Sequence, residues 1–272
     1  MSVTGLDLRA VDDWYGDILT PQSFHGRFQG CTGVIHLASV SRVIWGETYP
    51  DKCWATNVRG TQNILDQIQL CASLPWIIFA SSREVYGQPS VLPTNEDTIL
   101  SPVNTYGLSK LEGERRVSDS CRFGMRSGII RLSNVYGSTT DHPDRVVPAF
   151  AKAAVDGNRL RVDGADNTFD FTHLDDTVRG IVALALHFEN NGASTPPIQF
   201  VTGQPTTLQE LALKAKNFAK SDSDVIQSPS RTFDVSNFYG DPSRARYILG
   251  WEPKISIDEG LARLINDFTT AT

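Results

Sequence analysis

The sequence is poor in cysteine, has no long apolar run and has no excess of basic residues, and each lack excludes a class of protein. None of its four cysteines among 272 residues forms a C-x-x-C pair, so neither a zinc site nor a disulfide framework is indicated. No apolar run approaches the about 20 residues that span a bilayer, and MSVTGLDLRA (1–10) lacks the pattern of a signal peptide. A formal net charge of -6 argues against nucleic acid or an anionic membrane as the main partner. We therefore expect a cytoplasmic protein without a metal site.

Short apolar runs alternate with helical stretches through the first two thirds of the chain. TGVIHLAS (32–39), WIIFASS (76–82) and the run from 127 to 133 are apolar, rich in β-branched residues and ended by small residues, which predicts buried strands. Helical spacing covers 50–72 and 104–121. This alternation predicts the α/β class, a doubly wound parallel sheet with its site at the carboxyl ends of the strands.

The later part of the chain is less regular and indicates a second, smaller lobe. Turn-rich sequence over 157–176 precedes an apolar helix over 178–188, and a turn followed by an amphipathic helix is predicted over 250–268. We expect a Rossmann-like domain and a smaller C-terminal lobe. The first would comprise 1–133 and 168–202, and the second 134–167 and 203–272.

The stretch TYGLSK (105–110) places Tyr106 and Lys110 four residues apart. With Asn104 as its N-cap, a helix here would direct both side chains to one face. Such spacing also arises by chance. Such a pair could form part of a site. The alternative is that Lys110 is an ordinary solvated residue and that Ser82 only caps the end of a predicted strand.

Eight segments of the chain are motif-like and follow one another in a fixed order. They are GDI (16–18), IHLAS (35–39), NVRGT (57–61), SSREVYG (81–87), YGLSKLEGE (106–114), RLSNVYG (131–137), FDFTHLDD (169–176) and DPSRARYILGWEP (241–253). In this order they resemble the extended short-chain dehydrogenase/reductases of the NAD-dependent epimerase/dehydratase family, in particular those that are UDP-glucose 4-epimerase-like. The resemblance covers nearly the whole chain, and it implies that the Rossmann-like domain binds NAD and that the C-terminal lobe binds the substrate.

The resemblance implies catalytic roles for Tyr106, Lys110 and Ser82. A phenol with a pKa of about 10 is a poor base at neutral pH, but a neighbouring ammonium and an oxidised nicotinamide favour the phenolate. Tyr106 would take a proton from a substrate hydroxyl while hydride leaves the same carbon. Lys110 would also hold the nicotinamide ribose, and Ser82 would bind the reacting oxygen.

The resemblance also implies a set of residues that bind the cofactor. Asp7, at the end of what we expect to be the second strand, would bind the adenosine ribose, which favours NAD, although Arg9 leaves NADP open. Asp17 and Ile18 would lie at the adenine. The middle of the cofactor would be lined by His36, Leu37, Ala38 and Ser39. A histidine at a strand end that only packs is an equal alternative for His36.

The sequence departs from the family in lacking a first strand and a G-x-x-G-x-x-G loop, whose backbone N–H groups bind the pyrophosphate. We interpret the chain as incomplete, missing roughly 30 residues, about one βα unit. The alternative is a fold that rebuilt its sheet without that unit and gave up dinucleotide binding.

A second departure concerns the substrate. Phe169-Asp170-Phe171 stands where relatives that bind nucleotide-sugars carry Arg-Asp-Phe, but Arg231 and Asn134 match two other substrate-side positions. Ser82-Arg83-Glu84 replaces the Thr-Asp-Glu of the dehydratases, and arginine cannot act as a general acid. Glu84 could be catalytic, as in the related decarboxylases, but we interpret it as a solvated residue on the substrate side.

The resulting expectation is an NAD-dependent epimerase that oxidises and re-reduces a carbinol carbon of a nucleotide-sugar. One alternative is a dehydrogenase or reductase acting on a non-nucleotide substrate, and another is a cofactor-free binding or scaffold protein. The resemblance further implies a homodimer, paired through the helices of 50–72 and 104–121.

Overall fold

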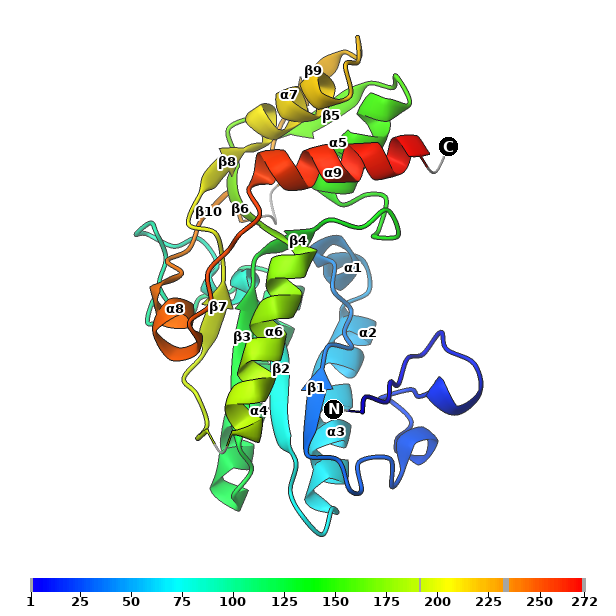
Figure 1. The fold of residues 1–272 in the computed structure, drawn as a ribbon, viewed down its shortest axis with the longest axis vertical. Helices are drawn as coiled ribbons and strands as arrows, with labels where there is room; N and C mark the ends of the chain where they lie inside the picture. The colour runs from blue at the N-terminus through cyan, green and yellow to red at the C-terminus, as the bar shows by residue number, and fades with distance from the viewer. Residues whose placement is uncertain (1, 191, 232–234, 271–272) are drawn as a thin grey trace. The chain divides into compact units, whose positions relative to one another are not determined.

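A computed structural model describes residues 2–190, 192–231 and 235–270, and its chain clusters into two compact units. Unit 1 comprises Met1–Gly87, Leu100–Arg131 and Leu184–Ile198, and unit 2 comprises Gln88–Ile99, Leu132–Ala183 and Gln199–Thr272. Figure 1 shows the elements of both units along the chain. Within the described residues no helix is both long enough and apolar enough to cross a membrane. The assignment of nucleotide-binding and substrate roles to particular stretches stays a prediction.

Unit 1 is built on a parallel sheet formed by the three predicted strands. These are β1 (Gly33–His36), β2 (Trp76–Ser82) and β3 (Ser127–Leu132). With β7 (Ile198–Phe200) they form a sheet in which the strands lie in the order β1-β2-β3-β7. β1 and β2 run parallel, with Gly33 opposite Trp76 and His36 opposite Phe79. Every residue of β2 is buried, as its continuous apolar run predicts. The predicted α/β class and parallel sheet are confirmed.

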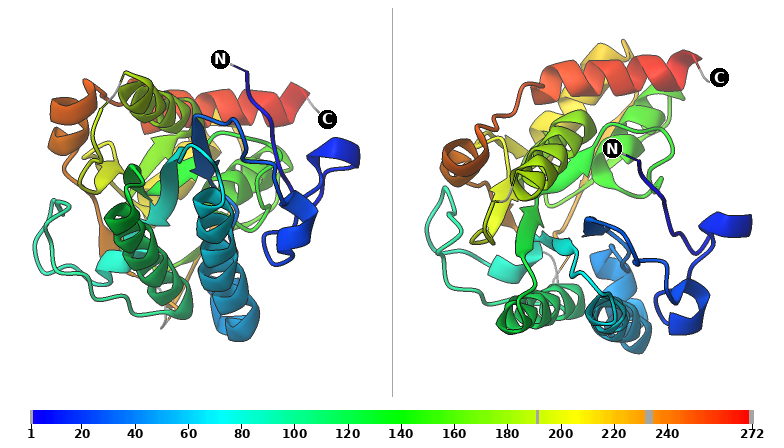
Figure 2. Two further views of the ribbon diagram at one scale, coloured as in Figure 1. Left: turned by 90° about the horizontal axis from the view of Figure 1, so that it is seen from below. Right: turned by 60° about the horizontal axis from the view of Figure 1, so that its bottom comes forward.

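The two predicted helical stretches of unit 1 cover one face of this sheet. The first is a continuous run of α2 (Pro50–Trp54), the π-helical turn η3 (Ala55–Arg59) and α3 (Gly60–Gln69), and it follows α1 (Val43–Thr48). The second is α4 (Thr105–Ser120). Figure 2 shows α3 and α4 side by side on one face, with the last turns of α6 (Leu174–Glu189) on the other. The core beneath α3 and α4 includes Phe24, Ile64, Leu65, Ile68, Phe79 and Val117.

The expected strand before Asp7 does not form. The described residues before Asp7 adopt no regular secondary structure, and Asp7 makes a single bridge with Tyr15. Two 3₁₀ turns follow, η1 (Asp12–Trp14) and η2 (Pro21–Phe24). A strand requires a neighbouring backbone that pairs along its length. Among the described residues only Tyr15 offers one, so the prediction of a strand was wrong.

Unit 2 has its own sheets and its own core. β6 (Thr168–His173) lies between β10 (Asn237–Phe238) and β4 (Asn134–Tyr136) in one sheet, with β8 (Pro205–Thr207) antiparallel to it. β5 (Leu160–Asp163) and β9 (Val225–Ser228) form a separate parallel pair. The helices that lie wholly within unit 2 are α5 (Val146–Val155), α7 (Leu208–Phe218), α8 (Ser243–Leu249) and α9 (Ile257–Thr270), and α6 begins in this unit. The buried cluster that α5, α7 and α9 share includes Phe150, Ala151, Phe171, Leu211, Leu261 and Leu264.

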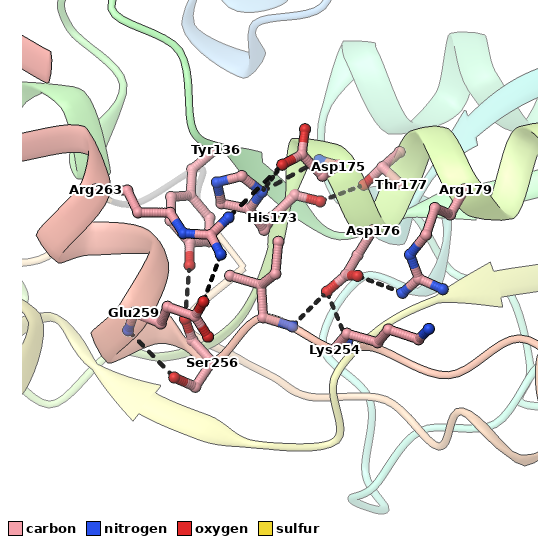
Figure 3. A network of polar contacts seen from close by, with 11 residues as sticks. Tyr136, His173, Asp175, Asp176, Thr177, Arg179, Lys254, Ser256, Glu259 and Arg263 are labelled. Atoms are coloured by element: carbon pink, nitrogen blue, oxygen red, sulfur yellow. Dashed lines mark hydrogen bonds and ion pairs between the residues drawn. The ribbon is translucent and has the colours of Figure 1, made fainter.

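Asp176, in the first turn of α6, fixes the segment that leads into α9 (Figure 3). Its buried carboxylate accepts the backbone N–H groups of Lys254 and Ile255, both at 2.9 Å, and forms an ion pair with Arg179. Its backbone carbonyl accepts the indole N–H of Trp251 at 2.9 Å. Burial alone would raise the pKa of Asp176, but the Arg179 guanidinium and the two backbone N–H groups hold it below its usual value.

Candidate active site

The predicted pair Tyr106 and Lys110 lies on one buried face of α4. Asn104 caps the helix, because its Oδ1 accepts the backbone N–H of Gly107 at 2.8 Å. Tyr106 is 8% exposed and Lys110 only 3%, and the Lys110 Nζ lies 5.9 Å from the centroid of the Tyr106 ring. The i, i+4 spacing therefore brings the phenol and the ammonium together as predicted.

The Lys110 ammonium is held at the end of β2 rather than in solvent. Its Nζ donates to the carbonyl oxygen of Ala80 at 2.8 Å and lies 5.2 Å from the centroid of the Phe79 ring. Burial lowers the pKa of Lys110 from its usual 10.5 to about 8, against the opposing influence of Cys53 and Glu114. The alternative of a solvated Lys110 was wrong. The site holds an ammonium whose pKa is close to neutral pH.

A buried carboxylate one turn further along α4 anchors this helix to the sheet. Glu114 accepts two hydrogen bonds from Arg131 of β3, at 3.0 and 2.8 Å, and one from Ser81 of β2 at 2.5 Å. Arg131 also donates to the hydroxyl of Tyr86 at 3.2 Å. Burial would lower the pKa of Arg131, but Glu114 outweighs it and holds that pKa above its usual value. The sheet and the face of α4 that carries Lys110 are therefore joined by a bidentate ion pair.

Ser82 and Glu84 follow at the carboxyl end of β2. The Ser82 Oγ accepts the backbone N–H of Glu84 at 3.2 Å, so Ser82 caps the short 3₁₀ turn η4 (Arg83–Tyr86). Glu84 is 4% exposed, and its Oε1 lies 2.9 Å from Arg83 while its Oε2 accepts the side-chain amide of Asn104 at 2.8 Å. The interpretation of Glu84 as solvated was wrong. A carboxylate can be buried here because both of its oxygens have donors.

His36 ends β1 and is almost fully buried. Its Nε2 lies 2.9 Å from the Oγ1 of Thr61, which itself donates to the backbone carbonyl of Asn57 at 2.6 Å. Because the Thr61 hydroxyl hydrogen is already used, His36 must donate from Nε2. Burial, and then the Lys110 charge, lower the pKa of His36 to about 3, so the ring is neutral. A packing role and a cofactor contact both stay open for His36.

The loop after β1 is tied to α4 through Asn57, a residue whose role the sequence did not suggest. Leu37 and Ala38 are exposed, and Ser39 is half-buried. Asn57 lies in the π-helical turn, accepts the N–H of Val40 at 2.8 Å and donates to its carbonyl at 3.1 Å. It also donates to the Oγ of Ser109 in α4 at 2.8 Å. The only signal in the sequence was the motif NVRGT that contains it.

Three of the predicted cofactor residues, Asp7, Asp17 and Ile18, lie on the N-terminal segment that precedes β1. The exposed Asp7 carboxylate accepts the backbone N–H of Arg9 at 2.7 Å, and that of Asp17 accepts the N–H of Leu19 at 2.9 Å. Ile18 is held by α3, because the Asn63 side chain donates to its carbonyl at 2.8 Å. These residues are therefore held by local turns and by α3, and their roles toward a cofactor stay predictions.

The remaining candidates, Asn134 and Arg231, belong to unit 2. Asn134 is the half-buried first residue of β4, and the exposed Arg231 lies 3.4 Å from the carboxylate of Asp163. Phe169, which stands where relatives carry arginine, is 7% exposed and packs edge-on to Phe171, with ring centroids 6.3 Å apart. Its position is that of a core residue, so the phenylalanine fits the packing of unit 2.

Comparisons with known proteins agree with this architecture. Residues 3–197 match the model of the NAD dependent epimerase/dehydratase family. A putative UDP-glucose 4-epimerase of Methanocaldococcus jannaschii is 31% identical over 88% of this chain and 77% of its own length. UDP-glucuronic acid decarboxylase 6 of Arabidopsis thaliana is 32% identical over 86% of this chain and 69% of its own.

The fold also matches that of solved proteins. A UDP-glucose 4-epimerase of Thermotoga maritima, crystallised with UDP-glucose, superposes with a TM-score of 0.87 at 26% identity, covering 94% of this chain and 84% of its own. The Rossmann-like assignment is thereby confirmed. Motifs, fold and family match agree that this chain is an enzyme of the NAD dependent epimerase/dehydratase family.

Proposed function

We propose that this protein is an NAD-dependent epimerase that acts on a nucleotide-sugar by transient oxidation at a carbinol carbon. The observation that carries the proposal is the buried pair of Tyr106 and Lys110 on one face of α4, beside the carboxyl end of β2 where Ser82 lies. Relatives that carry the names UDP-glucose 4-epimerase and UDP-glucuronic acid decarboxylase support a nucleotide-sugar as substrate.

Each of the three side chains has a role in this reaction. Tyr106, as the phenolate, takes the proton of the substrate hydroxyl, and the Lys110 ammonium stabilises that phenolate. Ser82 donates a hydrogen bond to the reacting oxygen, for which its Oγ hydrogen is available because the Oγ accepts from Glu84. When bound, NAD, held at its nicotinamide ribose by Lys110, would supply the hydride chemistry that inverts the carbinol carbon. After reduction, Tyr106 returns the proton to the oxygen.

The residues of unit 1 fit the nicotinamide end of the cofactor. The Lys110 ammonium is positioned by Ala80, and the exposed Leu37 and Ala38 follow directly on β1 at the same edge of a parallel sheet as Ser82. The described chain contains no G-x-x-G-x-x-G loop, so we assign no residue to the pyrophosphate.

A second candidate function is a dehydrogenase or reductase on a non-nucleotide substrate. The observation that favours it is the burial of Phe169 in the core of unit 2, at the place of an arginine that would bind a diphosphate. Arg231, which matches a second arginine that would bind the diphosphate, is present but exposed.

We also propose a homodimer formed through the helical run of residues 50–69 and α4. Trp54 is 43% exposed and Leu108 is 48% exposed, so apolar side chains of both helices face outward. Light scattering after size exclusion should give a dimer, and Leu108→Lys should shift it to a monomer if these helices form the interface.

The function is tested first by calorimetry with NAD and NADP, and then by the interconversion of UDP-glucose and UDP-galactose. Tyr106→Phe should lower kcat by about 100-fold or more, because the phenylalanine cannot exchange a proton. Tyr247→Phe, at a tyrosine 89% exposed, is the matched control and should retain activity. A folded chain that ignores both dinucleotides would refute the proposal and leave the cofactor-free alternative. Turnover of a carbonyl or alcohol substrate without UDP would favour the reductase.

A further inference from the structure

A continuous path of hydrogen bonds runs from the turn after β2 to the N-terminus of α4. It begins at Arg83, whose guanidinium lies 2.9 Å from Oε1 of Glu84. The other oxygen of Glu84 accepts the side-chain N–H of Asn104 at 2.8 Å, and Asn104 accepts the backbone N–H of Gly107 at 2.8 Å. Arg83, Glu84 and Asn104 are each at most 9% exposed as whole residues. The path ends one residue beyond Tyr106.

The orientation of the Asn104 amide is fixed by what its two neighbours can do. The backbone N–H of Gly107 can only donate, so the amide oxygen of Asn104 must face it. The amide nitrogen of Asn104 then faces Glu84, whose ionised carboxylate can only accept. A charge-assisted bond of this kind is stronger than one between neutral groups. Glu84 therefore reinforces the orientation in which Asn104 caps the helix.

Direct backbone packing also links the turn that carries Glu84 to the first turn of α4. A Cβ added to Gly107 would lie 2.7 Å from the carbonyl oxygen of Glu84, so the turn η4 and the first turn of α4 are in close contact. A second acidic residue, the exposed Glu47 of α1, accepts the backbone N–H of Thr105 at 2.9 Å. The helix turn that carries Tyr106 is thus held from two sides, by a buried carboxylate and by an exposed one.

We propose that Glu84 is a positioning residue for Tyr106, acting through the amide of Asn104, and that it exchanges no proton in the reaction. A proton on either carboxylate oxygen would face an N–H donor of Arg83 or Asn104 and weaken that bond. Arg83 balances the buried negative charge. Because displacements of about 1 Å at a reacting group can cost about 100-fold in rate, a loosened cap would lower turnover. The turnover readout of this proposal rests on the proposed function.

The first arm of the test is a double-mutant cycle measured by turnover of a UDP-sugar with bound NAD. Asn104→Ser keeps an oxygen that caps α4 but removes the donor to Glu84, and Glu84→Gln removes the charge. Each should lower kcat by about 10-fold or more with KM changed less than about 3-fold, and the double variant should be no worse than the poorer single one. Glu47→Gln, which keeps a side-chain oxygen to accept the Thr105 N–H, should change kcat less than about 3-fold. Losses that multiply in the double variant, or wild-type turnover of Glu84→Gln, would overturn the proposal.

The second arm needs no activity. In native-state hydrogen exchange, Glu84→Gln should speed exchange of the Gly107 N–H by about 10-fold or more, while amides of α9 in unit 2 exchange at the wild-type rate. Unchanged exchange at Gly107 would overturn the positioning role. A wild-type protein that turns over no UDP-sugar would refute the proposed function instead, and the exchange at Gly107 would then decide the role of Glu84 by itself.

Discussion

The buried ammonium of Lys110 should make the stability of this protein depend on pH in a way that one substitution removes. Burial lowers the pKa of Lys110 from 10.5 to about 8. One pKa unit corresponds to 1.36 kcal/mol, so keeping this ammonium charged in the folded protein costs about 3 kcal/mol. Lys110→Met removes that cost and also removes the hydrogen bond to Ala80, whose loss does not depend on pH.

The direction of the effect follows from the protons bound in each state. Below pH 8 both folded and unfolded chains carry a charged Lys110, and the wild-type protein bears the full cost. Between pH 8 and 10.5 the folded chain releases its proton while the unfolded chain keeps it, so the free energy of unfolding rises with pH. Relative to Lys110→Met, the wild type should therefore gain about 3 kcal/mol between pH 7 and pH 10.5.

The assay is urea unfolding of both proteins at several pH values across this range. Lys52→Met, at an exposed lysine of α2, is the matched control, and its difference from wild type should stay flat with pH. A flat difference for Lys110→Met as well would show that Lys110 is solvated in the folded protein. The burial of Lys110 on which the proposed role of Tyr106 and Lys110 depends would then be refuted.

Three further substitutions test buried contacts elsewhere in the two units. Asp176→Asn should lower the free energy of unfolding by about 3 kcal/mol at pH 7, since one amide oxygen cannot replace a carboxylate facing a cation and two N–H groups. The pKa of Asp176 is held below its usual value in the folded protein. In urea titrations this difference should therefore be full above about pH 4, the usual pKa of an aspartate, and should be lost as the pH falls through the lower pKa of the folded protein. Arg131→Met should cost about 3–5 kcal/mol in chemical unfolding, because Glu114 would stay buried without its cation. Gly107→Ala should lower kcat on a UDP-sugar by about 10-fold, because its Cβ would meet the Glu84 carbonyl at 2.7 Å; unchanged turnover would count against the close packing.

The parts of the site that the sequence predicted are those encoded by local pattern. WIIFASS is apolar on both faces and forms the fully buried β2. Asn104 precedes a helical pattern and caps α4, and the four-residue spacing places Tyr106 and Lys110 on one face of it. In each case the determining residues lie within about seven positions of one another in the sequence.

The parts that the sequence did not predict depend on partners distant in the chain. Glu84 looked solvated because its burial relies on Asn104, 20 residues later, and on an arginine whose direction the sequence does not fix. The strand expected before Asp7 needed a neighbouring backbone that the described chain does not bring to it. The π-helical turn around Asn57 was missed because a 3.6-residue period does not reveal a local widening of the helix.

The position of β1 at the end of its sheet has a practical consequence for handling this protein. Among the described residues no strand pairs with its outer edge, and GVIH offers no lysine, acidic residue or proline to block one. Ile35, 44% exposed, adds an apolar side chain beside those unpaired N–H and C=O groups. Such an edge is a template for a second molecule, so association should rise with concentration. We expect Ile35→Lys, which places a charge beside this edge, to lower that association in a concentrated sample.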